Sequence, residues 1–198
     1  RGWAIFSMIM VNYLGMFDSI HWQFKHHDYG MSFADTVAPA FMFAVGMGFR
    51  SSFARRRGAS SPAAAYIHAL RRYLALIFIG VVIYGPYLEN WQWWWDALVD
   101  IGFAGILSLP FIGQGNTVRA AAATAYLIAY QTAFLATGYG TWTMANSNDG
   151  GPLGIFPWAA ILLFGTIAFD ILAAPGNRKV VLQYLVWGLL LCTAGWLL

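Results

Sequence analysis

The sequence predicts an all-α fold, a polytopic bundle of about seven transmembrane helices. Sixty per cent of the 198 residues are hydrophobic and only 10% are charged, whereas ordinary soluble domains carry roughly 25% charged residues. Aromatic residues make up 18% of the chain, and many lie at the ends of apolar runs, where amphipathic rings prefer the lipid headgroup layer. The composition therefore indicates a protein embedded in a bilayer.

Seven apolar windows are candidates for the spanning helices. A bilayer core about 30 Å thick needs about 20 mostly apolar residues per helix, and lipid offers no partner to an unpaired backbone group, so each window is expected to be helical. The windows are residues 3–20, 33–50, 66–85, 97–113, 119–138, 155–173 and 180–198. We expect a single domain over residues 1–198, and a piece of a longer chain, because the sequence begins without Met and ends inside an apolar run.

The charged residues predict the orientation of these helices. Ten of the eleven basic residues fall on alternate connections, which the positive-inside rule places in the cytoplasm, and Lys25 is the exception. Most acidic residues then lie at the opposite face, together with the segment His21–Tyr29 and the aromatic run Trp91–Trp95. The ten basic residues are Arg1, Arg50, Arg55, Arg56, Arg57, Arg71, Arg72, Arg119, Arg178 and Lys179.

Several classes of function find little support. The net charge is +3, but the run of arginines at 55–57 lies in a short connection between apolar windows, where a topology signal explains it better than contact with nucleic acid. A single cysteine, Cys192, allows neither a disulfide framework nor a cysteine-based metal site. No HxxxH or HExxH helix spacing supports zinc, and we expect no metal. The zinc ligands would otherwise be His21, His26 or His27, and Asp28.

The segment 18–30 is the richest in chemistry. It contains three of the four histidines, Lys25 and two aspartates. A neutral imidazole can accept a proton from an attacking amine or hydroxyl, as acyl transfer from a thioester requires. A solvated loop whose histidines have no chemical role accounts for the same composition equally well, so both interpretations stay open.

Polar residues inside or beside the windows are further candidates. Asn12 falls about halfway along the first window, where its carboxamide would either bond a neighbouring helix or contact a reacting oxygen in a dry site. Asp35 and Asp100 begin the second and fourth helices, where the helix dipole favours an acid. Being acids close to hydrocarbon, they are also site candidates. His68 lies near the cytoplasmic end of the third helix, and we interpret it as interfacial, near a phosphate-bearing ligand.

The order of residues resembles that of a known family. The heparan-alpha-glucosaminide N-acetyltransferase family shows an Arg-Gly start, a Met-x-x-Val-Asn segment, a Lys-His loop and an Ala-Asp-Leu-Val-x-Pro helix start. The similarity is close over the first 50 residues and looser beyond. The runs that carry it are Arg1-Gly2, Met10-Val11-Asn12, Phe24-Lys25-His26, and Ala34-Asp35-Thr36-Val37 followed by Pro39.

The resemblance implies a membrane-embedded acetyltransferase that moves acetyl from cytosolic acetyl-CoA to a sugar-like acceptor at the opposite face of the bacterial inner membrane. We expect the chain to be too short to hold all of the family's helices. The family's catalytic histidine carries over onto His26 and its asparagine onto Asn12, with Asp35 as a third candidate. Since the loop is one residue shorter before Asp35, His27 stays an alternative to His26. A cytoplasmic arginine cluster could bind the phosphates of CoA. The positive-inside rule, by which arginines fix the orientation of the helices, explains the same arginines equally well. The members of the cluster are Arg55, Arg71, Arg72 and Arg119.

A function from another class fits the same sequence. A catalytically silent subunit of a larger membrane complex, for example an energy-transducing or pigment-protein complex, would keep the acyltransferase-like fold, and clustered tryptophans suit packing against lipids, pigments or subunits. Binding of CoA to the isolated chain would favour the enzyme. A transporter is weakly supported, because the intramembrane charges form no chain across the bilayer. The expected partners are the bilayer, an acceptor, and a homo-oligomer or larger complex.

Overall fold

The computed structural model describes residues 2–27, 30–84, 95–147, 149–176 and 178–197. Over these residues the chain forms eight α-helices and no strand, which confirms the all-α fold. Two short 3₁₀ helices, η1 (Trp22–Phe24) and η4 (Gly151–Gly154), precede α2 and α7. The α-helices are α1 (Gly2–Leu14), α2 (Phe33–Ala59), α3 (Pro62–Tyr84), α4 (Ala97–Ile112), α5 (Asn116–Ala136), α6 (Tyr139–Asn146), α7 (Ile155–Ala173) and α8 (Val180–Leu197).

The helix boundaries differ from the apolar windows in three places. The first window was expected to reach residue 20, but α1 ends at Leu14 and is followed by tight turns, in which Met16 N–H donates to Tyr13 O at 3.3 Å. Helix α2 continues nine residues beyond its window, because arginine and alanine are good helix formers even where the chain is too polar to lie in lipid. The eight-residue α6 was not predicted, since it is too short to appear as an apolar window.

The helices fit a membrane environment. Three of them are long and apolar enough to cross a bilayer, namely α2, the stretch Pro62–Ile83 of α3, and the stretch Gly151–Ala173 that joins η4 to α7. Helices α1, α4 and α8 contain shorter apolar stretches. Large apolar side chains cover much of the outer surface, as on α8, where Val181 and Leu189 are exposed. Such a surface needs lipid or a partner to cover it, which supports a membrane protein.

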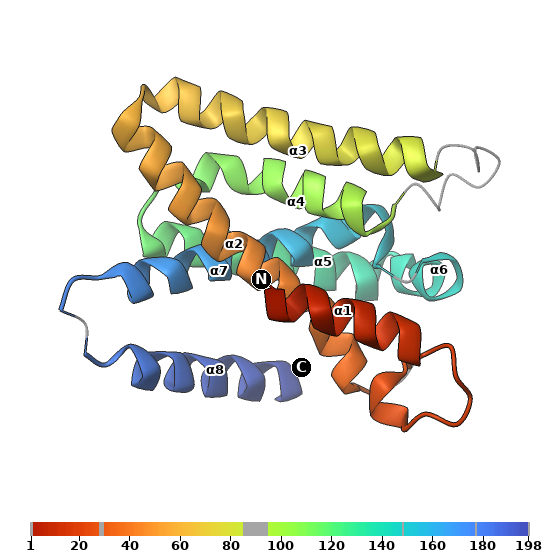
Figure 1. Cartoon of the computed structure of the whole chain (residues 1–198). Coiled ribbons are helices and arrows are strands. Elements are labelled where there is room, and N and C mark those ends of the chain that lie inside the picture. The colour runs from red at the N-terminus through yellow and green to blue at the C-terminus, as the bar shows by residue number, and fades with distance from the viewer. Residues whose placement is uncertain (1, 28–29, 85–94, 148, 177, 198) are drawn as a thin grey trace.

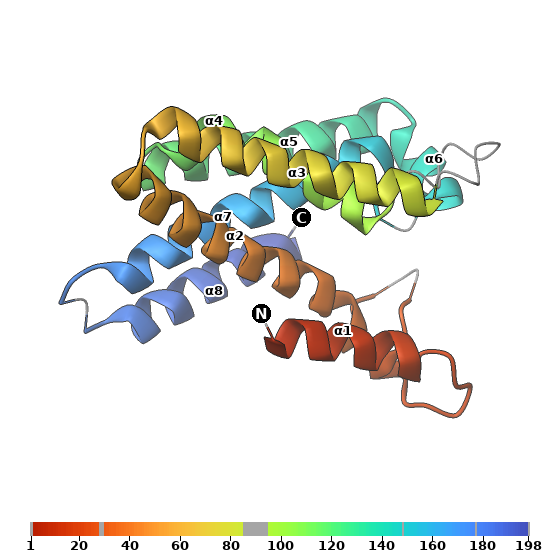
Figure 2. The same cartoon turned by 45° about the horizontal axis from the view of Figure 1, so that its top comes forward.

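Successive long helices run in opposite directions (Figure 1). The loop after α1 therefore lies at the same end of the molecule as α6, and the α2–α3 connection lies at the other end, as does the α7–α8 connection (Figure 2). Lys25 accordingly lies before the start of α2, and Arg56 lies in the last turn of α2, at the opposite end of the helix. Of the run Trp91–Trp95, all but Trp95 lie outside the described residues, as do Asp28 and Tyr29.

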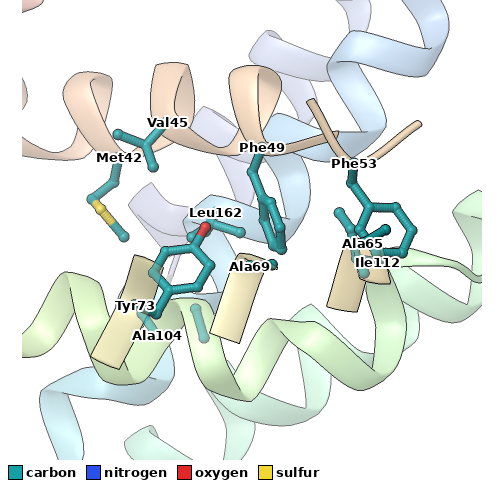
Figure 3. Packing of buried hydrophobic residues seen from close by; sticks show 11 residues of the cluster. Met42, Val45, Phe49, Phe53, Ala65, Ala69, Tyr73, Ala104, Ile112 and Leu162 are labelled. Atoms are coloured by element: carbon teal, nitrogen blue, oxygen red, sulfur yellow. The ribbon is translucent and has the colours of Figure 1, made fainter. Parts of the chain in front are cut away.

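The main hydrophobic core lies where α2, α3, α4 and α7 meet (Figure 3). The ring of Tyr73 on α3 meets Phe49 on α2 edge-on, with centroids 5.2 Å apart, and Phe53 packs against Tyr66 at 4.9 Å. Buried residues recur on α2 at intervals of three and four, which places them on one face of the helix. They are Met42, Val45, Gly46, Phe49 and Phe53.

Helices α2 and α7 cross with their backbones nearly in contact. A Cβ atom added at Gly46 would overlap the carbonyl oxygen of Leu162, and one added at Gly165 would overlap the carbonyl oxygen of Phe43 and lie 3.2 Å from Gly46 Cα. Small residues allow membrane helices to approach this closely, and the resulting van der Waals contact and dipole interactions hold them together where no hydrophobic driving force exists between helices.

A buried charge cluster ties four helices together near the other end of this crossing. Arg50 Nε on α2 donates to both carboxylate oxygens of Asp170 on α7, at 2.9 and 3.1 Å, and its Nη1 donates to the carbonyl of Ile112 at the end of α4, at 2.7 Å. Arg119 on α5 also donates to Asp170. Because Arg119 is only 1% exposed, Asp170 is its essential counter-charge.

Two neutral groups also accept hydrogen bonds from Arg119, whereas its buried Nε has no partner among the described residues. Its Nη1 donates to Thr166 Oγ1 at 2.8 Å, and its Nη2 donates to Asn116 Oδ1 at 2.5 Å. Two arginines therefore share one aspartate, and the excess positive charge is spread over carbonyl and hydroxyl oxygens. Such oxygen ligands reduce the cost of keeping charge in an apolar bundle.

The close crossing of α2 and α7 at Gly46 predicts how much stability one added methyl group would cost. Gly46→Ala should lower stability by about 1 to 3 kcal/mol, the usual cost of overpacking, because the added Cβ meets backbone that cannot move independently of α7. The midpoint of thermal unfolding in one detergent is the measurement. Gly58→Ala is the matched control in the same helix, since nothing lies within 4 Å of its added Cβ, and its midpoint should be unchanged or slightly higher. Equal midpoints for the two variants would contradict the crossing.

The charge cluster predicts a larger loss. Asp170→Ala leaves Arg119 buried without a counter-charge, and loss of one partner of a buried pair costs about 3 to 5 kcal/mol. The same thermal measurement checks it. Asp18→Ala removes an exposed acid from the loop after α1 and should leave the midpoint within error. A midpoint for Asp170→Ala close to that of the wild type would mean that the cluster contributes little to the fold.

Candidate active site

The loop between α1 and α2 is held over the first turn of α2. Val11 from α1 and Ala34 and Val37 from α2 form a small buried cluster, and Phe24 of η1 packs against it. Gln23 accepts a hydrogen bond from Phe33 N–H at 2.9 Å. These contacts bring the histidine-bearing loop to the N-terminus of α2. The order of residues in the sequence does not by itself predict this position.

Ser32 caps α2 and positions Asp35. The backbone N–H of Ser32 donates to Asp35 Oδ2 at 2.9 Å, and Asp35 N–H donates back to Ser32 Oγ at 3.4 Å, which together form a capping box. Ser32 Oγ also lies 2.7 Å from the carbonyl oxygen of Lys25 and 2.8 Å from Asp35 Oδ2, and its single hydrogen serves one of them at a time. The Asp35 carboxylate is thus fixed at the start of the helix through Oδ2, and its Oδ1 can accept a further hydrogen bond.

Asp35 Oδ1 accepts a hydrogen bond from His26 Nδ1 at 2.7 Å. In the neutral ring this places the hydrogen on Nδ1 and leaves Nε2 as the proton acceptor. His26 is 60% exposed and Asp35 25% exposed, so Nε2 is open to a substrate. A histidine oriented by a carboxylate is the arrangement that general bases use in acyl transfer.

The other two histidines of the loop bond the backbone. His27 Nε2 lies 2.9 Å from the carbonyl oxygen of Trp22 and must donate to it, while His21 Nδ1 accepts from Gln23 N–H at 3.4 Å and caps η1. Neither contact supplies a charged partner. Of the two alternatives that the sequence left open, the geometry therefore favours His26 over His27.

Asn12 does not lie at the depth that the sequence suggested. It was expected halfway along a spanning helix, but α1 ends two residues later, at Leu14, and Asn12 is exposed in its last turn. The prediction failed because apolar side chains continue past the helix end into the turns. As a result Asn12 lies at the same end of the molecule as His26 and Asp35.

A second acidic group lies at this end, at the starts of α4 and α7. Asp100 is fully buried, and neither carboxylate oxygen has a hydrogen-bond partner among the described residues. Asp149 lies in the loop before η4, where burial raises the pKa of its carboxyl, the charge of Asp96 raises it further, and His26 opposes the shift. Asp100 was a site candidate in the sequence, and the structure leaves it without a structural role in the described residues.

An apolar cavity of about 30 Å³ lies deeper in the bundle. Ala38 follows Asp35 by one helix turn and Met8 precedes Asn12 by one turn, and both line this cavity. It has room for about one small group, such as a water or a methyl. Its other lining residues are Phe41, Met42, Ala97, Ile101 and Trp158.

The predicted phosphate-binding arginines separate into two sets. Arg55 at the end of α2 and Arg71 and Arg72 on α3 are exposed, as is His68. Arg119 instead lies in the buried charge cluster, where Asp170, Thr166 and Asn116 occupy its terminal nitrogens. Arg119 is therefore poorly placed for the phosphate contact that the sequence suggested.

Sequence reasoning missed Asp170 and the role of Arg50. The available signal was an acid inside an apolar window, since Asp170 is the one acid in the window 155–173. Arg50 was interpreted as a topology signal, although it lies nine residues before the end of α2. Among the described residues no group of three or more His, Cys, Asp or Glu side chains is suited to a metal ion.

Comparison with known proteins places this geometry in a family. No curated protein and no solved structure matches the chain. A family model described as "Heparan-alpha-glucosaminide N-acetyltransferase, catalytic" matches residues 1–195, nearly the whole chain. The chain therefore belongs to the heparan-alpha-glucosaminide N-acetyltransferase catalytic family.

Proposed function

We propose that the protein is a membrane-embedded acetyltransferase that moves an acetyl group from acetyl-CoA to a sugar-like acceptor, within a single transmembrane domain. The observation that carries this proposal is the hydrogen bond between His26 and Asp35 at an exposed end of the bundle. Membership of the acetyltransferase family supplies the reaction class. The pair supplies an oriented base that such a reaction needs.

In this reaction the amine or hydroxyl of the acceptor attacks the thioester carbonyl. His26 Nε2 takes the proton of the attacking group, and Asp35 holds the imidazole by Nδ1 and stabilises the imidazolium that forms. The carbon–sulfur bond then breaks, the thiolate of CoA leaves, and the proton passes from His26 to the sulfur. Asn12, at the same end, is the candidate donor of an amide N–H to the carbonyl oxygen as it gains negative charge.

The proposed orientation follows from the charges. The end of the bundle at which α2 finishes, beside Arg55, faces the cytoplasm of a bacterial inner membrane, and His26 faces the opposite side. Arg71 and Arg72 lie about halfway along α3. Acetyl-CoA would enter from the arginine end, where guanidinium groups bind phosphates bidentately. The lipid bilayer and a homo-oligomer or larger complex are the proposed partners. A silent subunit is the alternative if the chain binds no CoA.

His26→Ala should abolish transfer while the bundle stays folded. Loss of a general base typically costs about 10² to 10⁴ in rate, and an exposed loop histidine contributes little to packing. Release of CoA from acetyl-CoA in the presence of glucosamine measures turnover, and thermal unfolding checks the fold. His27→Ala is the matched control, because the ring of His27 bonds a backbone carbonyl in the wild type. This variant should keep turnover within a few fold of the wild type. If His27→Ala loses activity and His26→Ala keeps it, the assignment is off by one. If both keep it, the imidazole mechanism is wrong.

Acetyl-CoA should bind the purified chain, with its phosphates near the exposed arginines. Each charge-assisted hydrogen bond contributes about 1.5 to 3 kcal/mol, so Arg71→Ala or Arg72→Ala should weaken binding by roughly tenfold or more in calorimetric titration. Arg178→Ala is the control, because it removes an exposed arginine at the same end that the proposal does not use. Absence of binding at millimolar acetyl-CoA would favour the silent subunit.

A further inference from the structure

Asp100 is a buried acid to which the described part of the chain gives no structural role. Its side chain is fully buried in the first turns of α4, and both carboxylate oxygens lack a hydrogen-bond partner among the described residues. The partly buried aspartate at the other end, Asp170, by contrast accepts hydrogen bonds from two arginines. An acid left unpaired in an apolar bundle is unfavourable for stability, and acids of this kind in membrane helices serve a function by default.

The group facing Asp100 is backbone without a side chain. Gly154, at the start of α7, is the nearest glycine, and a Cβ atom added there would lie 3.8 Å from Asp100 Oδ2. The loop that carries Gly154 is held in place by Tyr139, whose hydroxyl donates to Gly150 O at 2.6 Å, and by Trp158, whose Nε1 donates to Asp149 O at 3.1 Å. The carboxylate therefore lies beside a glycine-rich loop that is held by two hydrogen bonds, and no donor of the described residues reaches it.

This region is electrostatically connected to the candidate base. Asp149 interacts electrostatically with both His26 and Asp100, and the α1–α2 loop, the start of α4 and the start of α7 lie at the same end of the molecule (Figure 1). Two acids at the same end of the bundle as an oriented imidazole attract a group that donates hydrogen bonds or carries positive charge. Since the described residues provide no three-ligand metal group, an organic donor fits better than a metal ion.

We propose that Asp100, assisted by Asp149, binds the hydrogen-bond-donating group of the acyl acceptor, an ammonium or a hydroxyl, beside His26. The inference rests on the proposed acetyltransferase function and adds a residue that recognises the acceptor. The bound donor supplies a hydrogen-bond partner that the described residues do not offer the carboxylate. Asp149, which lies nearer the surface, completes the entrance to this site.

The test is calorimetric binding of D-glucosamine to the full chain in lipid nanodiscs, without acetyl-CoA. Asp100→Asn keeps the shape of the side chain and should weaken glucosamine binding at least tenfold, leave acetyl-CoA binding unchanged, and keep or raise the unfolding midpoint, because it removes a buried unpaired acid. Asp149→Asn should weaken glucosamine binding less. Asp18→Asn, an exposed acid at the same end, is the matched control and should bind as the wild type does.

Each other outcome overturns the inference. Unchanged glucosamine binding by Asp100→Asn, or no binding by the wild type, removes the site, and a lower unfolding midpoint makes Asp100 a structural residue. D-Glucose as a second probe distinguishes the donors: equal affinity indicates hydroxyls, and preference for glucosamine indicates the ammonium. Failure of the proposed function gives a different result from failure of this inference. In that case the chain does not bind acetyl-CoA but still binds glucosamine, and Asp100→Asn weakens glucosamine binding.

Discussion

The contact between the backbones of α2 and α7 at Gly46 and Gly165 sets the positions of both polar regions. Helix α2 carries Asp35 at its start and Arg50 further along, while α7 follows directly from Gly154 and carries Asp170 near its end. A shift of one turn between the two helices would separate Arg50 from Asp170 and would bring side chains into the crossing where only glycines fit. The charge cluster and the region around His26 are therefore held in one register by the same contact.

The protein buries acids in two different ways. Asp170, which is 24% exposed, is matched by two arginines, and oxygens from three further residues accept hydrogen bonds from these arginines, so the cluster holds four helices together although Arg119 Nε has no partner among the described residues. Asp100 is fully buried and has no such matching among the described residues. A satisfied buried charge network rigidifies a fold, whereas an unsatisfied one is a liability unless a ligand completes it.

The sequence predicted the helices and the family well, because lipid demands long apolar runs and the family signature is local. It could not choose between His26 and His27, since the choice depends on Asp35, nine residues away, folding back onto one ring through the cap at Ser32. Asn12 was placed too deep, because hydropathy does not register where a helix stops. Arg119 was misjudged, since its acid is 51 residues further along the chain, and a single charge in a window does not reveal its partner.

The two ends of the molecule impose a constraint on the proposed reaction. Asp35 and Arg55 lie about 30 Å apart along α2 at 1.5 Å per residue, so a co-substrate held by its phosphates at the arginine end must extend far into the bundle to bring its thioester to His26. The cavity below the His26–Asp35 pair holds about 30 Å³, enough for an acyl methyl but not for the arm that carries it. The path must therefore open between helices. The α2–α7 crossing cannot open without breaking the charge cluster, whereas α1, which supplies Met8 to the cavity wall, is held to α2 mainly by the small cluster around Val11. If the proposed function holds, entry of the co-substrate is thus easiest beside α1, the helix that carries Asn12.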